Sequence, residues 1–189
     1  MKRLFAIFMG CIVASCAQKG INGLREYEIA HNTHNVQRAL SFYDDSISFE
    51  IKGVWTKNGL KEIRELELWD STLNSRLEIE ILNQKLDSFW CRVREENDWF
   101  KAAGIEYLIH EPVTFVVRKG KIHSIQVTST QEANQKIGRV ISSLFDWSQN
   151  NGDSSIYRLV SGNGFIYSPA AALQWIQLFE KAKTVKQTD

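Results

Sequence analysis

Four segments in the middle of the chain carry the residue pattern of β-strands, and they constrain the fold more than any other feature of the sequence. Residues 77–82 and 86–95 alternate apolar and polar side chains along most of their length. Residues 105–118 are rich in β-branched side chains, and a Lys-Gly turn at 119–120 leads to a returning segment at 122–130. Strands joined by short turns pair antiparallel, so we expect a long antiparallel sheet here.

Helical periodicity occurs on both sides of these strands. Residues 24–42 should form a helix that is broken or bent near 32–35, and residues 60–73 place apolar side chains at helical spacing. After the strands, residues 131–148 carry one apolar stripe, and a Ser-Pro pair at 168–169 is a typical start for the last helix. The chain therefore combines several helices with one sheet.

The order of these elements predicts the fold class. A short strand at 46–51 follows the first helix, so the order is helix, strand, helix and then a run of long strands. This order predicts an α+β fold in which helices pack on one face of a curved antiparallel sheet. We expect one compact domain over residues 24–130 and a C-terminal helical extension over residues 131–189.

The N-terminal segment has the three parts of a signal peptide. Lys2 and Arg3 supply a positive start, and residues 4–14 are almost entirely apolar. This apolar run is too short to cross a hydrocarbon core of about 30 Å as a helix. Ser15 and Cys16 then complete a Val-Ala-Ser-Cys sequence with the form of a lipobox. It predicts cleavage between Ser15 and Cys16 and a lipid on the Cys16 sulfur.

A bacterial lipoprotein precursor follows from this interpretation, with a signal peptide at 1–15 and a short polar tether at 16–23. The lipid would attach the mature chain to the membrane. Ala17, rather than Asp, follows Cys16, and by resemblance to sorting in Gram-negative bacteria this favours the outer membrane. The full chain has a net charge of +1, and losing two cations with the signal peptide leaves it near neutral. Composition therefore gives no argument for a nucleic-acid partner.

Three passages resemble the nuclear transport factor 2-like (NTF2-like) superfamily, in particular its SnoaL-like branch. Residues 39–49 resemble a helix end, an Asp-Asp turn and the first strand; residues 59–66 resemble a Gly-initiated helix; residues 113–125 resemble a late hairpin with a Gly-Lys-Ile return. The resemblance covers about 24–130 and implies a cone-shaped, cystatin-like curved sheet around a pocket open at one end. It also implies the sheet face as the surface for a homodimer.

The members of this superfamily do not share one function. They include ketosteroid isomerases, polyketide cyclases, dehydratases, epoxide hydrolases and non-catalytic binding or dimerisation modules. The fold therefore does not select among these functions.

Glu50 is the first candidate for chemistry in the implied pocket. In the ketosteroid isomerase branch a carboxylate base stands at the end of the first strand, where Glu50 falls, and Tyr27 lies near the place of that branch's phenol. An apolar pocket raises the pKa of a carboxylate, which suits proton abstraction. No Asp or Glu lies between Pro112 and Arg118, where the branch has its protonated acid. The competing interpretation is a solvent-facing Glu50.

His110 and His123 are the second candidate. With a turn at 119–120, Val116 pairs with His123 and His110 pairs with Ser129, which places both imidazoles on one sheet face. Two imidazoles on a pocket wall can act as acid, base or ligand. The alternative is one histidine at the rim and one exposed, because a register error of one residue moves His123 to the other face.

Further polar and aromatic positions have weaker patterns. Trp69 follows the apolar stripe of the second helix, and Asp87 could extend the apolar face of the strand after it; both are expected in the pocket, with core packing as the ordinary alternative. The charges within 92–96 should lie on a solvated or dimer-facing surface. His31 and His34 have a metal-compatible spacing, but no Cys or carboxylate set completes it, so we expect no metal and no cofactor.

These observations favour a lipid-anchored binding module that holds a small apolar ligand or a protein partner. One alternative is a small acid–base enzyme of the isomerase, cyclase or dehydratase type that uses Glu50 or the pair His110 and His123. A second alternative is a structural assembly subunit, for which residues 131–189 would form the interface.

Overall fold

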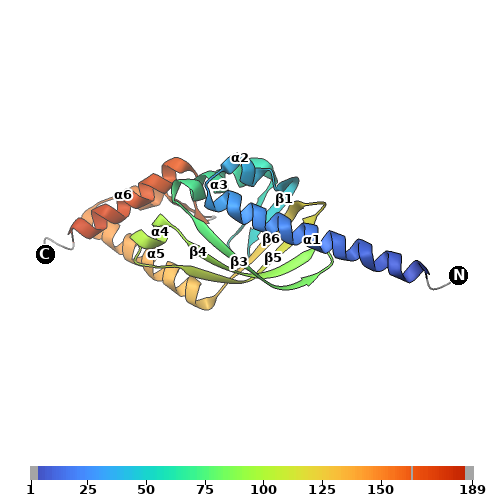
Figure 1. Cartoon of the computed structure of the whole chain (residues 1–189). Helices are drawn as coiled ribbons and strands as arrows, with labels where there is room; N and C mark the ends of the chain where they lie inside the picture. Colours follow the sequence, from blue (N-terminus) through green and yellow to red (C-terminus); the bar gives the residue numbers. More distant parts are fainter. Residues whose placement is uncertain (1–3, 163, 186–189) are drawn as a thin grey trace.

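The computed structural model describes residues 4–162 and 164–185 of the chain. Its centre is a six-stranded curved sheet with the strand order β2-β1-β6-β5-β4-β3 (Figure 1). The strands are β1 (Tyr43–Ile51), β2 (Trp55–Asn58), β3 (Arg76–Lys85), β4 (Ser88–Glu96), β5 (Leu108–Arg118) and β6 (Lys121–Ser129).

The first and last long strands, β1 and β6, run parallel, whereas the other neighbouring pairs of this sheet are antiparallel. The expectation of a wholly antiparallel sheet is therefore wrong at this pairing. Turn signals report only on strands that are consecutive in the chain, and most of the domain separates β1 from β6. The α+β class, with helices packed on a curved sheet, is confirmed.

The first two helices show the predicted break. α1 (Leu4–Asn32) ends where the sequence predicts it, and α2 (Val36–Leu40) begins after a short turn. His34 in the turn has a φ of 57°, and the Asn35 side chain caps α2 by accepting a hydrogen bond from the Arg38 amide at 3.0 Å. α3 (Gly59–Thr72) follows β2, and α1 and α3 both pack on the sheet (Figure 1).

Side chains of α1 satisfy the backbone of β3, which lies at an edge of the sheet. The Asn32 amide donates to the Leu77 carbonyl and accepts from the Leu77 amide, both at 2.8 Å. Glu28 accepts from the amide of Ile79 at 3.3 Å. An edge strand with free backbone groups can pair with other chains. Here α1 occupies those groups and fixes its own position along the sheet.

The segment predicted as a tether, 16–23, is helical and belongs to α1. Gly20 is buried against the sheet, and a Cβ at this position would lie 2.5 Å from Cζ of Phe89. The absence of a side chain thus lets α1 approach β4. Lys2 and Arg3 lie outside the described residues. Within the described part of the chain, no helix combines the length and apolarity needed to span a membrane.

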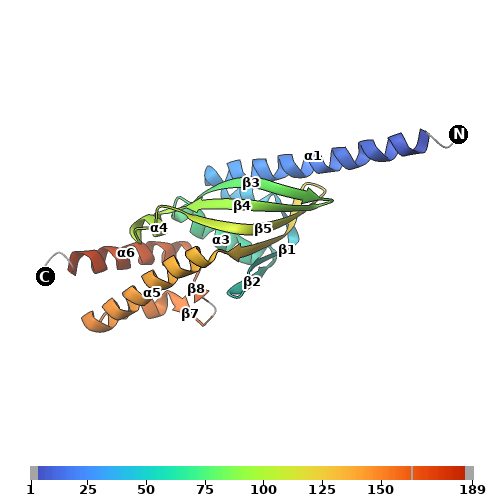
Figure 2. The same cartoon turned by 90° about the horizontal axis from the view of Figure 1, so that it is seen from below.

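Residues 131–185 form the predicted helices together with small elements between them. They pack at the end of the domain opposite the N-terminus of α1 (Figure 2). Two short elements of the main domain, β2 and α4, were not predicted, because each is too short for its residue periodicity to be recognised. The additional elements are α4 (Asp98–Ala102), α5 (Gln131–Asn151), η1 (Ser155–Arg158), β7 (Val160–Ser161), β8 (Gly164–Phe165) and α6 (Pro169–Val185).

A cluster of aromatic rings joins the extension to the domain. Phe165 of β8 lies 5.5 Å from Trp99 of α4 and 4.9 Å from Trp175 of α6, between ring centroids. Trp99 and Trp175 lie 5.6 Å apart, and both are almost completely buried. Fully burying side chains of this size contributes about 2–3 kcal/mol each. The extension is therefore part of the same folded body.

Candidate functional site

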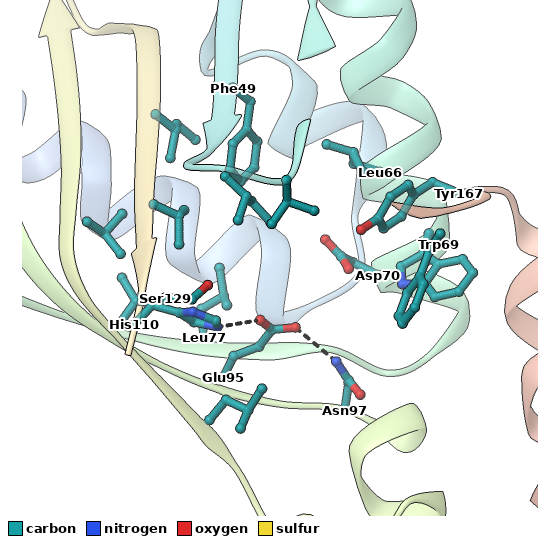
Figure 3. Close-up of a pocket in the computed structure, with 18 of the residues that line it drawn as sticks. Phe49, Leu66, Trp69, Asp70, Leu77, Glu95, Asn97, His110, Ser129 and Tyr167 are labelled. Atoms are coloured by element: carbon teal, nitrogen blue, oxygen red, sulfur yellow. Dashed lines mark hydrogen bonds and ion pairs between the residues drawn. The ribbon is translucent and has the colours of Figure 1, made fainter. Parts of the chain in front are cut away.

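The concave side of the sheet encloses a cavity of about 440 Å³. This volume is within the range of small-molecule sites. The walls are mostly apolar and come from the sheet, from α1 and α3, from α5 and from the chain around β8 (Figure 3). The extension thus supplies part of the wall, although the resemblance did not include it.

Exposed residues among the lining side chains show where the cavity opens. Val54, in the turn between β1 and β2, is 53% exposed. Asn134 and Gly138, on the first turns of α5, are exposed as well. Gly164 also lines the cavity, and a Cβ there would lie 3.7 Å from Val54. The opening lies between the β1–β2 turn and α5.

A β-bulge turns His110 into the cavity. Between the pairs His110–Ser129 and Val113–Val127, two residues of β5 face one residue of β6. The extra residue reverses the alternation of side chains along the strand. His110 therefore lines the cavity together with Val113, whereas a regular strand would have pointed it to the other face. The predicted pairing of His110 with Ser129 is confirmed.

A second bulge, in β6, excludes His123. Val116 pairs with Ser124 rather than with His123, so His123 is the extra residue of this bulge. It does not line the cavity, and its Nδ1 atom lies 3.6 Å from a carboxylate oxygen of Asp44. The predicted pair of His110 and His123 on one face is wrong. The two bulges compensate each other, which is why the distant pairing with Ser129 was still correct.

Glu95 is the cavity partner of His110. Its Oε2 lies 3.4 Å from His110 Nε2, and its Oε1 accepts a hydrogen bond from the Asn97 amide at 2.9 Å (Figure 3). Burial raises the pKa of Glu95, but the hydrogen bond and charge of His110, aided by Asn97, outweigh it and leave the pKa lowered. The expectation that Glu95 lies on an exposed surface is wrong, because it continues the inward face of β4.

Glu67 organises a second polar group, deeper in the cavity. Its Oε1 accepts hydrogen bonds from Tyr43 at 2.7 Å and from Tyr27 at 3.2 Å, and the two phenolic oxygens lie 2.8 Å apart. Burial, with the negative charge of Glu67, raises the pKa of both tyrosines. Tyr27 lines the cavity, as expected, but its hydroxyl is engaged by Glu67 rather than free for a ligand.

His31 completes this deeper group. Its Nδ1 lies 3.3 Å from Glu67 Oε2, and its Nε2 lies 3.4 Å from the hydroxyl of Ser75. Burial alone would lower the pKa of His31, but the Glu67 carboxylate more than compensates and raises it to about 9. His31 therefore forms a buried ion pair with Glu67. Within the described residues, no group of three His, Cys, Asp or Glu side chains could hold a metal ion.

Asp70 differs from the other carboxylates of the cavity. It extends from α3 into the cavity beside Trp69 and Tyr167 (Figure 3). Among the residues that the structure describes, none donates a hydrogen bond to its carboxylate or forms an ion pair with it. Burial raises its pKa well above the usual value, and the charges of Glu95 and Glu67 add to this against the opposing effect of His31.

Glu50 does not reach the cavity. Its neighbours Phe49 and Ile51 line it, and because side chains alternate along a strand, Glu50 lies on the opposite face. There it accepts a hydrogen bond from Gln126 at 2.7 Å. The hypothesis of a catalytic base at Glu50 is therefore wrong.

Of the remaining two candidates, Trp69 and Asp87, only the first lines the cavity. Trp69 lines the cavity, as expected. Asp87 does not, because it lies in the turn before β4, where the alternation of that strand no longer holds. It forms an ion pair with Arg118 at 2.5 Å, which lowers its pKa.

The carboxylates that sequence reasoning missed had a readable signal. Glu67 and Asp70 follow Leu60 and Ile63 at spacings of three and four residues, so they lie on the apolar stripe of α3. Charged side chains on an apolar stripe are rarely buried without a partner or a role. The position of these two carboxylates on the apolar stripe was therefore the sequence feature that could have identified them as cavity residues.

Comparisons with known proteins reveal a likeness in structure. No protein-family model and no curated protein matches the sequence. Among solved structures, the epoxide hydrolase/cyclase-like enzyme SalBIII aligns with a TM-score of 0.55 and 19% identity, over 62% of this chain and 95% of the enzyme. A putative polyketide cyclase from Xanthomonas campestris aligns with a TM-score of 0.52 and 12% identity, over 65% of this chain and 97% of the cyclase.

The fold is NTF2-like. A third aligned structure, RV0760c from Mycobacterium tuberculosis in complex with estradiol-17beta-hemisuccinate, has a TM-score of 0.51 and 11% identity, over 61% of this chain and 96% of the other. At these identities the likeness establishes the NTF2-like fold alone. The function must therefore be argued from the cavity itself.

The buried ion pair of His31 predicts a pH-dependent stability. The folded-state pKa of about 9 exceeds the ordinary value near 6.5, so the stabilisation is complete below about pH 6.5 and is lost as the pH rises through 9. The free energy of unfolding should fall by roughly 2–3 kcal/mol over this interval. Denaturant titrations should show this decline in the wild type and a flatter profile in His31→Gln. Parallel profiles would contradict the ion pair.

Proposed function

We propose that the protein binds a small, mostly apolar molecule in the NTF2-like cavity. The observation that carries this proposal is the enclosed volume of about 440 Å³ with mostly apolar walls and a few polar groups that converge on it. Cavities of this kind are the usual sites of small ligands. The aligned RV0760c structure, which is a complex with a steroid derivative, supports the proposal by analogy.

The polar groups argue for binding rather than for a filled core. Burying ionisable side chains in a protein interior costs free energy unless they are paired. Five such groups line this cavity among mostly apolar side chains. A core that served stability alone would gain by replacing them with apolar side chains. The groups are Glu67, Asp70, Glu95, His31 and His110.

The binding proposal predicts that filling the cavity abolishes binding. Val113 lies on the cavity side of β5, whereas Thr114 is the next residue and points to the other face. Val113→Phe should weaken the binding of a neutral solvatochromic naphthalene dye by about tenfold or more, whereas Thr114→Phe should not change it. Fluorescence titration measures both. Equal affinities in the two variants, or no saturable binding in the wild type, would contradict the proposal.

A second candidate function is acid–base catalysis on the bound molecule. It is favoured by Glu95, a carboxylate that faces the mostly apolar cavity and is held in a fixed orientation between His110 and Asn97. Glu95 thereby takes the place that the sequence interpretation gave to Glu50. Turnover of carbonyl or epoxide compounds, followed by mass spectrometry, should fall at least about a hundredfold in Glu95→Gln. Undiminished turnover in that variant would exclude this role.

We also propose that Cys16 carries a lipid and attaches the domain to the outer membrane. The lipobox sequence supports this proposal. The N-terminus of α1 and the extension lie at opposite ends of the molecule (Figure 1). An anchor at Cys16 would thus direct the extension away from the membrane.

The anchor predicts a change in mass that depends on Cys16. Intact-mass spectrometry of the membrane fraction should find a chain that begins at Cys16 and carries acyl groups. Cys16→Ser should abolish both cleavage and acylation, because the thiol is the acceptor. Cys11→Ser, within the apolar run, is the matched control and should mature normally. Normal maturation of Cys16→Ser would refute the anchor.

A further inference from the structure

Four aromatic rings form a continuous arc on the cavity wall. Phe49 lies 5.3 Å from Trp55, Trp55 lies 5.6 Å from Tyr167, and Tyr167 lies 5.2 Å from Trp69, measured between ring centroids. All four rings line the cavity. Trp55 Nε1 donates a hydrogen bond to the Tyr167 hydroxyl at 3.0 Å, which fixes the middle of the arc. The arc joins two strands of the sheet and α3 to the extension.

The arc ends at Asp70, the next residue after Trp69 on α3. Figure 3 shows the Asp70 carboxylate directed into the cavity beside the rings of Trp69 and Tyr167. Within the described residues, the other cavity carboxylates, Glu67 and Glu95, have protein partners. Asp70 has none among them, so its hydrogen-bonding capacity is directed at the cavity space.

We propose that this corner of the cavity, formed by Asp70 and the aromatic arc, binds an organic ammonium group, so that the ligand is an apolar amine. The inference rests on the proposed binding function and names its ligand class. Aromatic faces attract cations, and cages of several rings bind alkylammonium groups. A carboxylate without a protein partner supplies the opposite charge. The rest of the cavity wall accommodates the apolar body of the amine.

The charges around the corner favour a cation over an anion. Glu67, Glu95 and, once it is ionised, Asp70 place three negative charges on the cavity wall against two histidines, of which His31 is already paired with Glu67. In an enclosed site such charges act through a low effective dielectric constant and are weakly screened. An anionic ligand would therefore be repelled.

One protein cation opposes the proposal, and it supplies a second test. Lys57 Nζ lies 5.6 Å from the centroid of Trp55 and 5.3 Å from that of Tyr167. Lys57 is not a lining residue, so it contacts these rings from outside the cavity. Replacing it with Met should raise the affinity for an amine and leave the affinity for a neutral analogue unchanged.

Binding of an ammonium group should expel a proton from Asp70. In the empty cavity, burial and the charges of Glu95 and Glu67 raise the pKa of Asp70, against the effect of His31. His110, which faces Glu95, and Tyr167, whose own pKa is raised, complete the titratable surroundings. A bound cation reverses the balance and favours the carboxylate. The affinity for the amine should therefore increase with pH until Asp70 is ionised in the free protein.

Three probes of one shape test the charge preference. Adamantan-1-amine is a cation at neutral pH, adamantan-1-ol is neutral, and adamantane-1-carboxylate is an anion. Calorimetric titrations of the full-length chain in one mild detergent should give the amine at least about a tenfold higher affinity than the alcohol, and the carboxylate the lowest affinity. At a pH low enough for Asp70 to be protonated in the free protein, titrations of the amine in two buffers of different ionisation enthalpy should show proton release, whereas the alcohol should show none.

Asp70→Asn is the decisive variant. It keeps the size of the side chain and removes no hydrogen bond or ion pair within the described residues, so the fold should be retained. The affinities for the amine and the alcohol should become equal to within about threefold, and proton release should disappear.

The outcomes separate this inference from the binding proposal. Equal affinities of the amine and the alcohol in the wild type, or a preference that survives in Asp70→Asn, would overturn the inference and leave the binding proposal standing. If none of the three probes binds, and the naphthalene dye does not bind either, the binding proposal fails together with the inference. Proton release with the amine in the wild type supports the inference without any variant.

Discussion

The structure depends on covering the concave face of a strongly curved sheet. A curved sheet presents a deep apolar surface, and α1 and α3 cover only part of it (Figure 1). Residues 131–185 close the remaining end through the rings of Phe165, Trp99 and Trp175. Because this closure leaves about 440 Å³ unfilled, the same elements that complete the fold also shape the site. Removing the extension would therefore expose the core and open the cavity together.

Inside the cavity, an ionisable side chain keeps its charge at ordinary pH only if it has a partner; without one, its pKa shifts to favour the neutral form. Glu67 has His31 and two tyrosines, and Glu95 has His110 and Asn97. These pairs hold their side chains in place at a desolvation cost, which apolar residues would avoid. Asp70 has no such partner among the described residues, and its raised pKa is the physical consequence. The ligand class follows from this imbalance and from the aromatic arc beside it.

Periodicity predicted the long elements well because their apolar faces are buried. The break after Asn32 and the hairpin at 119–120 were predicted by local backbone chemistry. The pairing of β1 with β6 and the bulge at His123 were not, because both depend on contacts between distant segments. The site was predicted only in part: Trp69, Tyr27 and His110 line the cavity, but Glu50, His123 and Asp87 do not. A bulge or a strand end reverses the face of a side chain, and no sequence pattern marked these positions.

The central claim is that the Asp70 carboxylate has no partner among the described residues and can therefore bind a ligand, whereas Glu95 is paired with His110. Carbon-13 NMR of the side-chain carboxyl carbons, followed against pH and assigned with Asp70→Asn and Glu95→Gln, measures this directly. Asp70 should titrate well above the usual range of aspartate, and Glu95 below the usual range of glutamate, because of their different surroundings. Titration of both groups at their ordinary pKa values would contradict the account.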